Sequence, residues 1–131
     1  MIATPYSENC IKMRDLPPEA LQHVAHYFQA LAEPARLRIL NLLRGGEMSV
    51  SELAEKCGYS VPNVSRHLVT LTKNGFVSRE GRGTSVFYRI ADASVFELCD
   101  LVCGSVGRQL ESKARESVLF MQGTARAPVQ K

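Results

Sequence analysis

Apolar residues recur at the three- and four-residue spacing of amphipathic helices over most of the chain. In PPEALQHVAHYFQALA, residues 17–32, this spacing predicts a first helix with one apolar stripe. Pro34 interrupts the pattern and is expected to open a second helix, because proline is tolerated in the first turn. The second helix is predicted to end at Gly45-Gly46, and a last helix is predicted over about residues 93–121.

Two short helices in the middle of the chain are separated by only a few residues. Ser49 and Glu52 have the spacing of a capping box, so a third helix is predicted to begin there and to end at Gly58. The segment GYS then leads into a fourth helix, predicted over residues 61–74 with Gly75 as its stop. A short helix, a tight turn containing glycine and a second helix together predict a helix-turn-helix.

The period of the pattern changes after the fourth helix. FVSRE (76–80) and SVFYRI (85–90) favour strands, and the GRGT segment between them is typical of a turn. We therefore predict a β-hairpin with Arg79 and Arg82 at or near its tip. The predicted fold class is mostly α-helical with a β-hairpin.

The length of 131 residues favours one domain. Residues 1–17 lack the apolar core of a signal peptide and are predicted to form a flexible arm, followed by a folded domain over 18–122 and a disordered tail over 123–131. No apolar run in the sequence is long enough to span a bilayer, so no membrane partner is expected. A cytoplasmic protein is expected, with its four cysteines reduced and no structural disulfide framework.

Positive charge is concentrated in one block of the chain. Residues 61–90 contain five basic side chains and one acidic side chain, a net charge of +4, whereas the remainder carries −1. Such a block is expected where a polyanion binds. It coincides with the fourth helix and the hairpin, which makes nucleic acid an expected partner of these two elements.

The fourth helix places polar side chains opposite its apolar stripe of Val64, Leu68 and Leu71. Side chains of this kind suit base edges and phosphates, and the hydroxyl of an N-cap serine and the amides near it suit a phosphate. Arginines in the hairpin suit phosphate or minor-groove contacts. The same charges are also typical of an ordinary solvated surface. The predicted DNA-binding residues are Ser60, Pro62, Asn63, Ser65, Arg66, His67, Thr70, Lys73, Arg79 and Arg82.

The stretch LAEPARLRILNLLRGGEMSVSELAEKCGYSVPNVSRHLVTLTKNGFVSREGRGTSVFYRI resembles the winged helix-turn-helix of the ArsR/SmtB family of metal- and metalloid-responsive repressors. The resemblance covers roughly residues 20–105, with the elements in the same order. It implies a homodimer built on the first and last helices. It also implies a repressor, not an enzyme, that binds double-stranded DNA at a palindromic operator and leaves it when an inducer binds.

Cys99 and Cys103 lie one turn apart on the same face of the last predicted helix. Thiolates select soft, thiophilic centres, and two thiols at this spacing can converge on one atom. The family resemblance implies a sensor site here, because some members place inducer thiols in the last helix. Trivalent arsenic or antimony is the expected inducer, a soft divalent metal is the alternative ligand, and no permanent cofactor is expected.

Two further cysteines are candidates for a third sulfur ligand. Cys10 lies in the N-terminal arm, from which it could reach the last helix of a dimer partner. Cys57 lies on the inner face of the third helix, where a small apolar core residue is the simpler interpretation. The helix that carries Cys57 lacks the C-V-C pair of one kind of family member, and the last helix lacks the histidine of the zinc-binding kind.

Alternatives to metalloid sensing remain open. With Phe96, Val106 and Leu110, the two cysteines of the last helix form one apolar stripe that is also typical of a dimer core. A repressor that senses oxidants or reactive sulfur through the same thiols is the main alternative, and a DNA-binding protein with no ligand is another. An enzyme is disfavoured, because CGSVGR is one residue too short for a C-x5-R loop.

Overall fold

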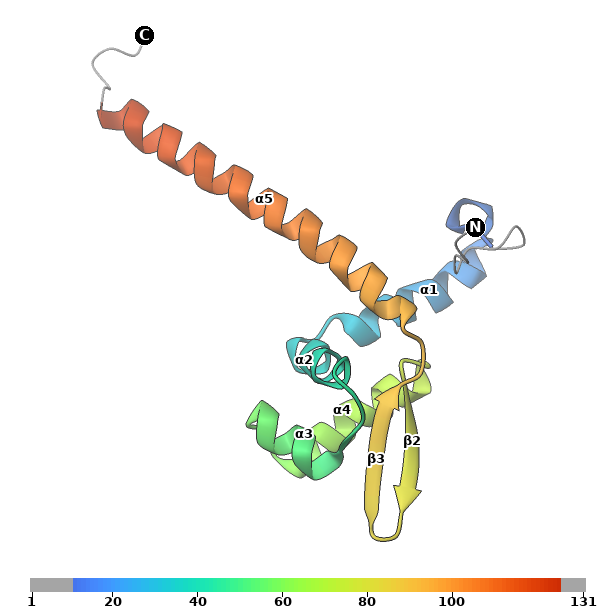
Figure 1. Ribbon diagram of the computed structural model, residues 1–131. Coiled ribbons are helices and arrows are strands. Elements are labelled where there is room, and N and C mark those ends of the chain that lie inside the picture. The colour runs from blue at the N-terminus through green and yellow to red at the C-terminus, as the bar shows by residue number, and fades with distance from the viewer. Residues whose placement is uncertain (1–10, 126–131) are drawn as a thin grey trace, which may run out of the picture. The chain divides into compact units, whose positions relative to one another are not determined.

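The computed structural model describes residues 11–125, which divide into a first unit ending at Ala93 and a second unit beginning at Ser94. The first unit contains, in order, a short 3-10 turn, two helices, a very short strand, two more helices and a hairpin (Figure 1). The second unit is one long helix. The predicted mostly helical fold with a β-hairpin is confirmed.

The N-terminal segment falls partly outside the described residues. Residues 1–10, including Cys10, lie beyond them, so the predicted flexibility of the arm stays a prediction. Within the segment that was expected to be an arm, Met13–Asp15 form a single 3-10 turn, η1.

Helices α1 (Pro18–Leu31) and α2 (Pro34–Leu43) each begin with a proline in the first turn, as the sequence predicts. The last carbonyls of a helix have no partner within the helix. Arg36 supplies one here, because its Nε donates to the carbonyl of Ala30 at 2.6 Å and its Nη2 donates to that of Gln29 at 3.3 Å. One arginine of α2 therefore caps the end of α1.

Helices α3 (Val50–Cys57) and α4 (Val61–Lys73) form the predicted helix-turn-helix. The capping box is present: the Glu52 amide donates to Ser49 Oγ at 3.1 Å, and the Ser49 amide donates to Glu52 Oε1 at 2.8 Å. Gly58 ends α3 in the left-handed conformation at φ 75°, with its amide 2.9 Å from the carbonyl oxygen of Ala54. Local signals in the sequence therefore define both ends of α3.

The core of the first unit is built by α2, α3, α4 and the start of the hairpin. Its fully buried side chains come from helix positions one turn apart and from the residues that enter the first hairpin strand. They are Ile39, Leu53, Val64, Leu68, Leu71 and Phe76. The ring of Tyr27 lies 4.6 Å from that of Phe76, measured between centroids, so α1 also contacts this core. Burial of these apolar surfaces is the main stabilising contribution.

The hairpin consists of β2 (Val77–Arg82) and β3 (Ser85–Ile90), paired antiparallel with Arg82 opposite Ser85. A two-residue strand that the sequence pattern does not predict, β1 (Met48–Ser49), pairs with the other edge of β3. The sheet order is therefore β1-β3-β2. β3 is the central strand, and β1 and β2 lie on either side of it.

The apolar stripe predicted for α1 is only partly buried. Leu31 is buried, whereas Leu21 and Phe28 remain exposed by 39% and 48%. Leu37 of α2 is also exposed. Helical periodicity identifies an apolar face but does not indicate which element packs against it. Much of the apolar face of α1 is not covered by the described part of this chain.

The second unit is helix α5 (Ser94–Ala125), which extends beyond the predicted end at residue 121. The predicted disordered tail over 123–131 is therefore wrong for residues 123–125, since Gly123 continues the helix instead of ending it. Residues 126–131 lie outside the described residues. No helix within residues 11–125 is both long and apolar enough to cross a membrane.

Replacing Ser49 tests the capping box. Ser49→Ala removes the acceptor for the Glu52 amide and is expected to lower the free energy of unfolding by about 0.5–2 kcal/mol. Urea unfolding at fixed protein concentration measures the change. Ser51→Ala, at an exposed position in the first turn of the same helix, is the matched control and is expected to be neutral. Equal effects of the two substitutions would contradict the assignment.

Candidate functional site

Helix α4 buries one face and exposes the opposite one. The buried residues are Val64, Leu68 and Leu71, each 0% exposed, as predicted. With 3.6 residues per turn, the positions farthest from this stripe lie half a turn around the helix. They are Pro62, Arg66, Val69 and Lys73, and all four are exposed.

The N-terminal end of α4 is ordered by side-chain caps. Ser60 is the predicted N-cap, and its Oγ accepts a hydrogen bond from the Asn63 amide at 3.2 Å. The Asn63 side chain in turn accepts a hydrogen bond from the Arg66 guanidinium. This contact holds the Arg66 side chain toward the first turn of the helix, where amides and positive charge favour an anion.

Four predicted contact residues lie beside the exposed face instead of on it. Asn63, Ser65, His67 and Thr70 are half-buried. Asn63, His67 and Thr70, which were predicted as DNA contacts, are thus only partly exposed. These three lie on the same side of the helix, between the buried stripe and the exposed face.

His67 differs most from its predicted role because it contacts α2. Its Nδ1 lies 3.3 Å from Arg36 Nη1. A guanidinium can only donate, so Nδ1 accepts and the imidazole is neutral in this contact. Burial lowers the pKa of His67, and the charge of Arg36 lowers it further. The side chain therefore joins α4 to the residue that also caps α1.

The exposed face of α4 contains an apolar residue that the list of predicted contacts omits. Val69 is 55% exposed between Arg66 and Lys73. An exposed valine on such a face suits the methyl group of thymine, which hydrogen-bonding side chains do not recognise. The helical period places Val69 on this face, but its side chain has no hydrogen-bonding group that would mark it as a DNA contact in the sequence.

The two hairpin arginines have different environments. Arg79 is exposed, and no hydrogen bond or ion pair is found for it among residues 11–125. Arg82 is hydrogen-bonded to Glu47 and Glu80 and lies over the ring of Phe87. Arg79 and Arg82, both predicted to contact DNA, therefore differ in this structure, because only Arg82 is engaged by carboxylates in the described part of the same chain.

Cys99 and Cys103 lie one turn apart on α5, as predicted. Cys99 is half-buried and Cys103 is exposed, and neither forms a disulfide. Two thiols on one helix face match the ligand chemistry of a thiophilic centre. Within residues 11–125, no three His, Cys, Asp or Glu side chains are grouped closely enough to hold a metal ion.

Cys57 is buried in α3, in agreement with the core interpretation. Burial raises the pKa of its thiol, although the nearby Arg38 acts in the opposite direction. A raised pKa lowers the thiolate fraction at neutral pH and makes the sulfur a poorer ligand. Cys10, the other candidate, lies outside the described residues.

The helix-turn-helix region matches the family model described as "Bacterial regulatory protein, arsR family" over residues 33–79. The HTH-type transcriptional regulator NmtR of Mycobacterium tuberculosis is 40% identical over 85 residues, which cover 65% of this chain and 71% of NmtR. The chain belongs to the ArsR family. The HTH-type transcriptional regulator KmtR of the same organism is also similar to this chain. It is 39% identical over 83 residues, which are 63% of this chain. The matched part spans 64% of KmtR, a little under two thirds of its length.

Solved structures related to this ArsR-family chain have the same fold. The homodimeric winged helix-turn-helix DNA-binding domain Mb0332 of Mycobacterium bovis is 34% identical with a TM-score of 0.65, and the match covers 76% of this chain and 95% of that one. The AntR antimony-specific transcriptional repressor is 27% identical with a TM-score of 0.64, covering 79% and 96%. The ArsR-family chain thus has the winged helix-turn-helix fold of these transcriptional regulators.

The contact of His67 with Arg36 predicts a pH dependence of stability. Because the pKa of His67 is lowered in the folded chain, the unfolded chain binds more protons below about pH 6.5. The free energy of unfolding is therefore expected to fall as the pH falls through that range. Urea unfolding between pH 7.5 and 5.5 measures it.

His67→Gln is expected to show a smaller fall, because glutamine takes up no proton. His23→Gln, at an exposed position of α1, is the matched control and is expected to follow the unaltered chain. An identical pH dependence of unfolding in His67→Gln and the unaltered chain would contradict this prediction.

Proposed function

We propose that this ArsR-family chain is a homodimeric transcriptional repressor. Helix α4, the recognition helix, and the wing, residues 77–90, bind double-stranded operator DNA. Binding of trivalent arsenic or antimony to Cys99 and Cys103 releases the repressor. The observation that carries the proposal is a recognition helix with one exposed basic face in the same chain as two thiols one turn apart on α5.

The exposed side chains of α4 and the wing support DNA binding. Arg66 and Lys73 extend from the exposed face of the recognition helix, and Arg79 adds an exposed charge on the wing. Cations of this kind position a protein on phosphates, whereas side chains that reach base edges supply sequence preference. Val69 and Asn63, which lie beside these cations on α4, are the side chains proposed to reach base edges.

Exposed apolar surface supports the dimer. Leu21 and Phe28 leave part of the α1 face uncovered. On α5, Val102, Val106 and Leu110 remain 49%, 46% and 60% exposed. Apolar residues exposed along a helix face mark a protein–protein contact, and a second copy using α1 and α5 would cover those of each helix. Two recognition helices about 34 Å apart would then contact a palindromic operator.

The thiols of α5 support a soft inducer. In arsenite, As(OH)₃, each thiol can replace one hydroxide, so that an As–S bond forms and the thiol proton leaves with the hydroxide as water. Side chains at i and i+4 lie about 5–6 Å apart at Cβ, which allows both sulfurs to approach one atom without unfolding the helix. The AntR repressor, a structural neighbour, is antimony-specific, which supports the same chemical class. Cys10, the partner chain or solvent supplies any third ligand.

Inducer binding on α5 would act on DNA through the dimer. If α5 forms part of the contact between two copies, a change in its packing changes the spacing of the two recognition helices. Operator binding requires them about one DNA turn, ~34 Å, apart. Loss of this spacing releases the repressor without any change in the recognition helix itself.

Replacing Arg66 tests the recognition helix. Arg66→Gln removes one exposed charge from each protomer and is expected to weaken DNA binding and to reduce the slope of log K against log salt by about 0.9 per protomer on the DNA. Fluorescence anisotropy on operator DNA, over a series of salt concentrations, measures both effects. Arg115→Gln removes an equal charge from α5, where Arg115 pairs with Glu111, and is expected to leave the slope unchanged. Equal losses in the two variants would contradict a direct contact.

Replacing the two thiols tests the inducer site. Arsenite or antimonite is expected to release the unaltered chain from DNA in reducing buffer, as measured by anisotropy at fixed salt. Cys99→Ser/Cys103→Ser is expected to bind DNA with the same affinity and not to be released. Cys57→Ala removes a thiol from the core and is expected to respond as the unaltered chain does.

The same titration separates the alternatives. Release of the double variant by arsenite would move the inducer site away from α5. Release of the unaltered chain by a polysulfide, with no response to arsenite, antimonite, cadmium or zinc, would favour a sensor of reactive sulfur. Equal DNA affinity with and without every one of these ligands would indicate a DNA-binding protein without an inducer.

A further inference from the structure

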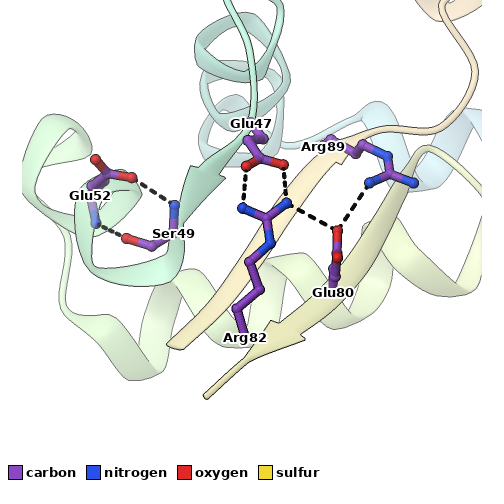
Figure 2. Close-up of polar contacts among 6 residues, drawn as sticks. All are labelled: Glu47, Ser49, Glu52, Glu80, Arg82 and Arg89. Atoms are coloured by element: carbon purple, nitrogen blue, oxygen red, sulfur yellow. Dashed lines mark hydrogen bonds and ion pairs between the residues drawn. The ribbon is translucent and has the colours of Figure 1, made fainter. Parts of the chain in front are cut away.

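A network of four charged side chains spans the sheet. Arg82, the last residue of β2, donates from Nη1 to Glu47 Oε2 at 2.5 Å and from Nη2 to Glu47 Oε1 at 2.9 Å. Its Nη2 also donates to Glu80 Oε1 at 3.1 Å, and Arg89 Nη1 donates to the same oxygen at 3.2 Å. Figure 2 shows these contacts on one face of the hairpin. Arg82 and Glu47 form a two-pronged contact between residues 35 positions apart.

Strand register explains how the network forms. Alternate residues of a strand point to the same face, so Glu80 and Arg82 share a face of β2, and Phe87 and Arg89 share it on β3. Glu47 comes directly before β1, which pairs with the opposite edge of β3. To reach Glu47, Arg82 crosses the central strand, and its guanidinium carbon lies 4.7 Å from the centre of the Phe87 ring. The arginine is therefore held by a ring below it and two carboxylates.

The network neutralises part of the basic block. Its two carboxylates balance its two guanidiniums, so this face of the wing has no net charge although the surrounding sequence is basic. The hydrogen bond from Arg82 lowers the pKa of Glu80, which keeps that carboxylate charged at neutral pH. Arg79 on the same strand has no such partner among residues 11–125. Two arginines three positions apart therefore differ in how readily they can contact DNA.

We propose that Glu47 is a positioning residue that holds Arg82 across the sheet while the protein is off DNA, and that Arg82 exchanges Glu47 for a backbone phosphate when the wing reaches DNA. This inference rests on the proposed DNA binding. The guanidinium fork fits a carboxylate and a phosphate equally, since both accept two parallel hydrogen bonds. The exchange is feasible because the side chains of Arg82 and Glu47 are 43% and 36% exposed.

The exchange makes Glu47 a restraint on DNA affinity. Breaking the contact between Arg82 and Glu47 opposes binding to every DNA sequence, because phosphates carry no sequence information. Operator DNA offers additional base contacts that offset this penalty, whereas unrelated DNA does not. Glu47 thereby limits the time that the protein spends on non-specific sites.

The test uses the unaltered full chain, four variants of it and a fluorescein-labelled 30-base-pair duplex of unrelated sequence. Glu47→Gln is expected to bind this duplex about two- to fivefold more tightly, the range for loss of one exposed ion pair, with an unchanged salt slope. Arg82→Gln is expected to bind more weakly and to lower the slope by about 0.9 per protomer on the DNA. In Glu47→Gln/Arg82→Gln, the gain from the first substitution is expected to disappear, because the arginine through which Glu47 acts is absent.

Removal of any negative charge can favour DNA, so Glu55→Gln, at an exposed position of α3, is the matched control. A gain in Glu55→Gln equal to that in Glu47→Gln would overturn the proposal. So would a gain from Glu47→Gln that persists without Arg82, or weaker binding by Glu47→Gln at an unchanged unfolding midpoint. Failure of the unaltered chain to bind either this duplex or operator DNA would instead overturn the proposed function.

Discussion

The recognition helix must bury one face to be held in place, and this constraint determines what it presents to DNA. Val64, Leu68 and Leu71 pack into the core at one-turn spacing. The opposite face must then point toward solvent. Arg66 and Val69 are exposed because they lie half a turn from the buried stripe. A core substitution that rotated α4 would move the side chains proposed to contact DNA with it. Stability and DNA recognition are therefore coupled through three apolar side chains.

Features defined by neighbouring residues were predictable from the sequence. The capping box of Ser49 and Glu52, the Gly58 stop and the N-cap Ser60 each depend on residues within one turn of helix, and all are present. The spacing of Cys99 and Cys103 on one helix face is local in the same way. The end of α5 is the exception. Glycine frequently ends a helix, but it can also continue one when the residues around it favour helix, as at Gly123.

Features that depend on distant residues were not predictable from the pattern. Arg36 contacts His67 across 31 positions, and Arg82 contacts Glu47 across 35. Periodicity identifies both basic side chains as polar surface residues, but it contains no information about which carboxylate or ring nitrogen folding brings near them. These two contacts change the candidate site most, since one makes His67 a structural link between helices and the other neutralises an arginine expected to be available.

The pairing of β1 with β3 has a consequence for the order of folding. Met48 lies opposite Tyr88, so this contact closes a loop of 40 residues. The contacts between α3 and α4 connect residues much nearer in sequence, and closing a short loop loses less chain entropy than closing a long one. We expect the helix-turn-helix to assemble early. Strand β1 is expected to join the sheet last, because its contacts connect residues far apart in sequence. Glu47, which directly precedes β1, would then reach Arg82 only in the final stage, so the charge on the wing becomes neutralised as the native topology is completed.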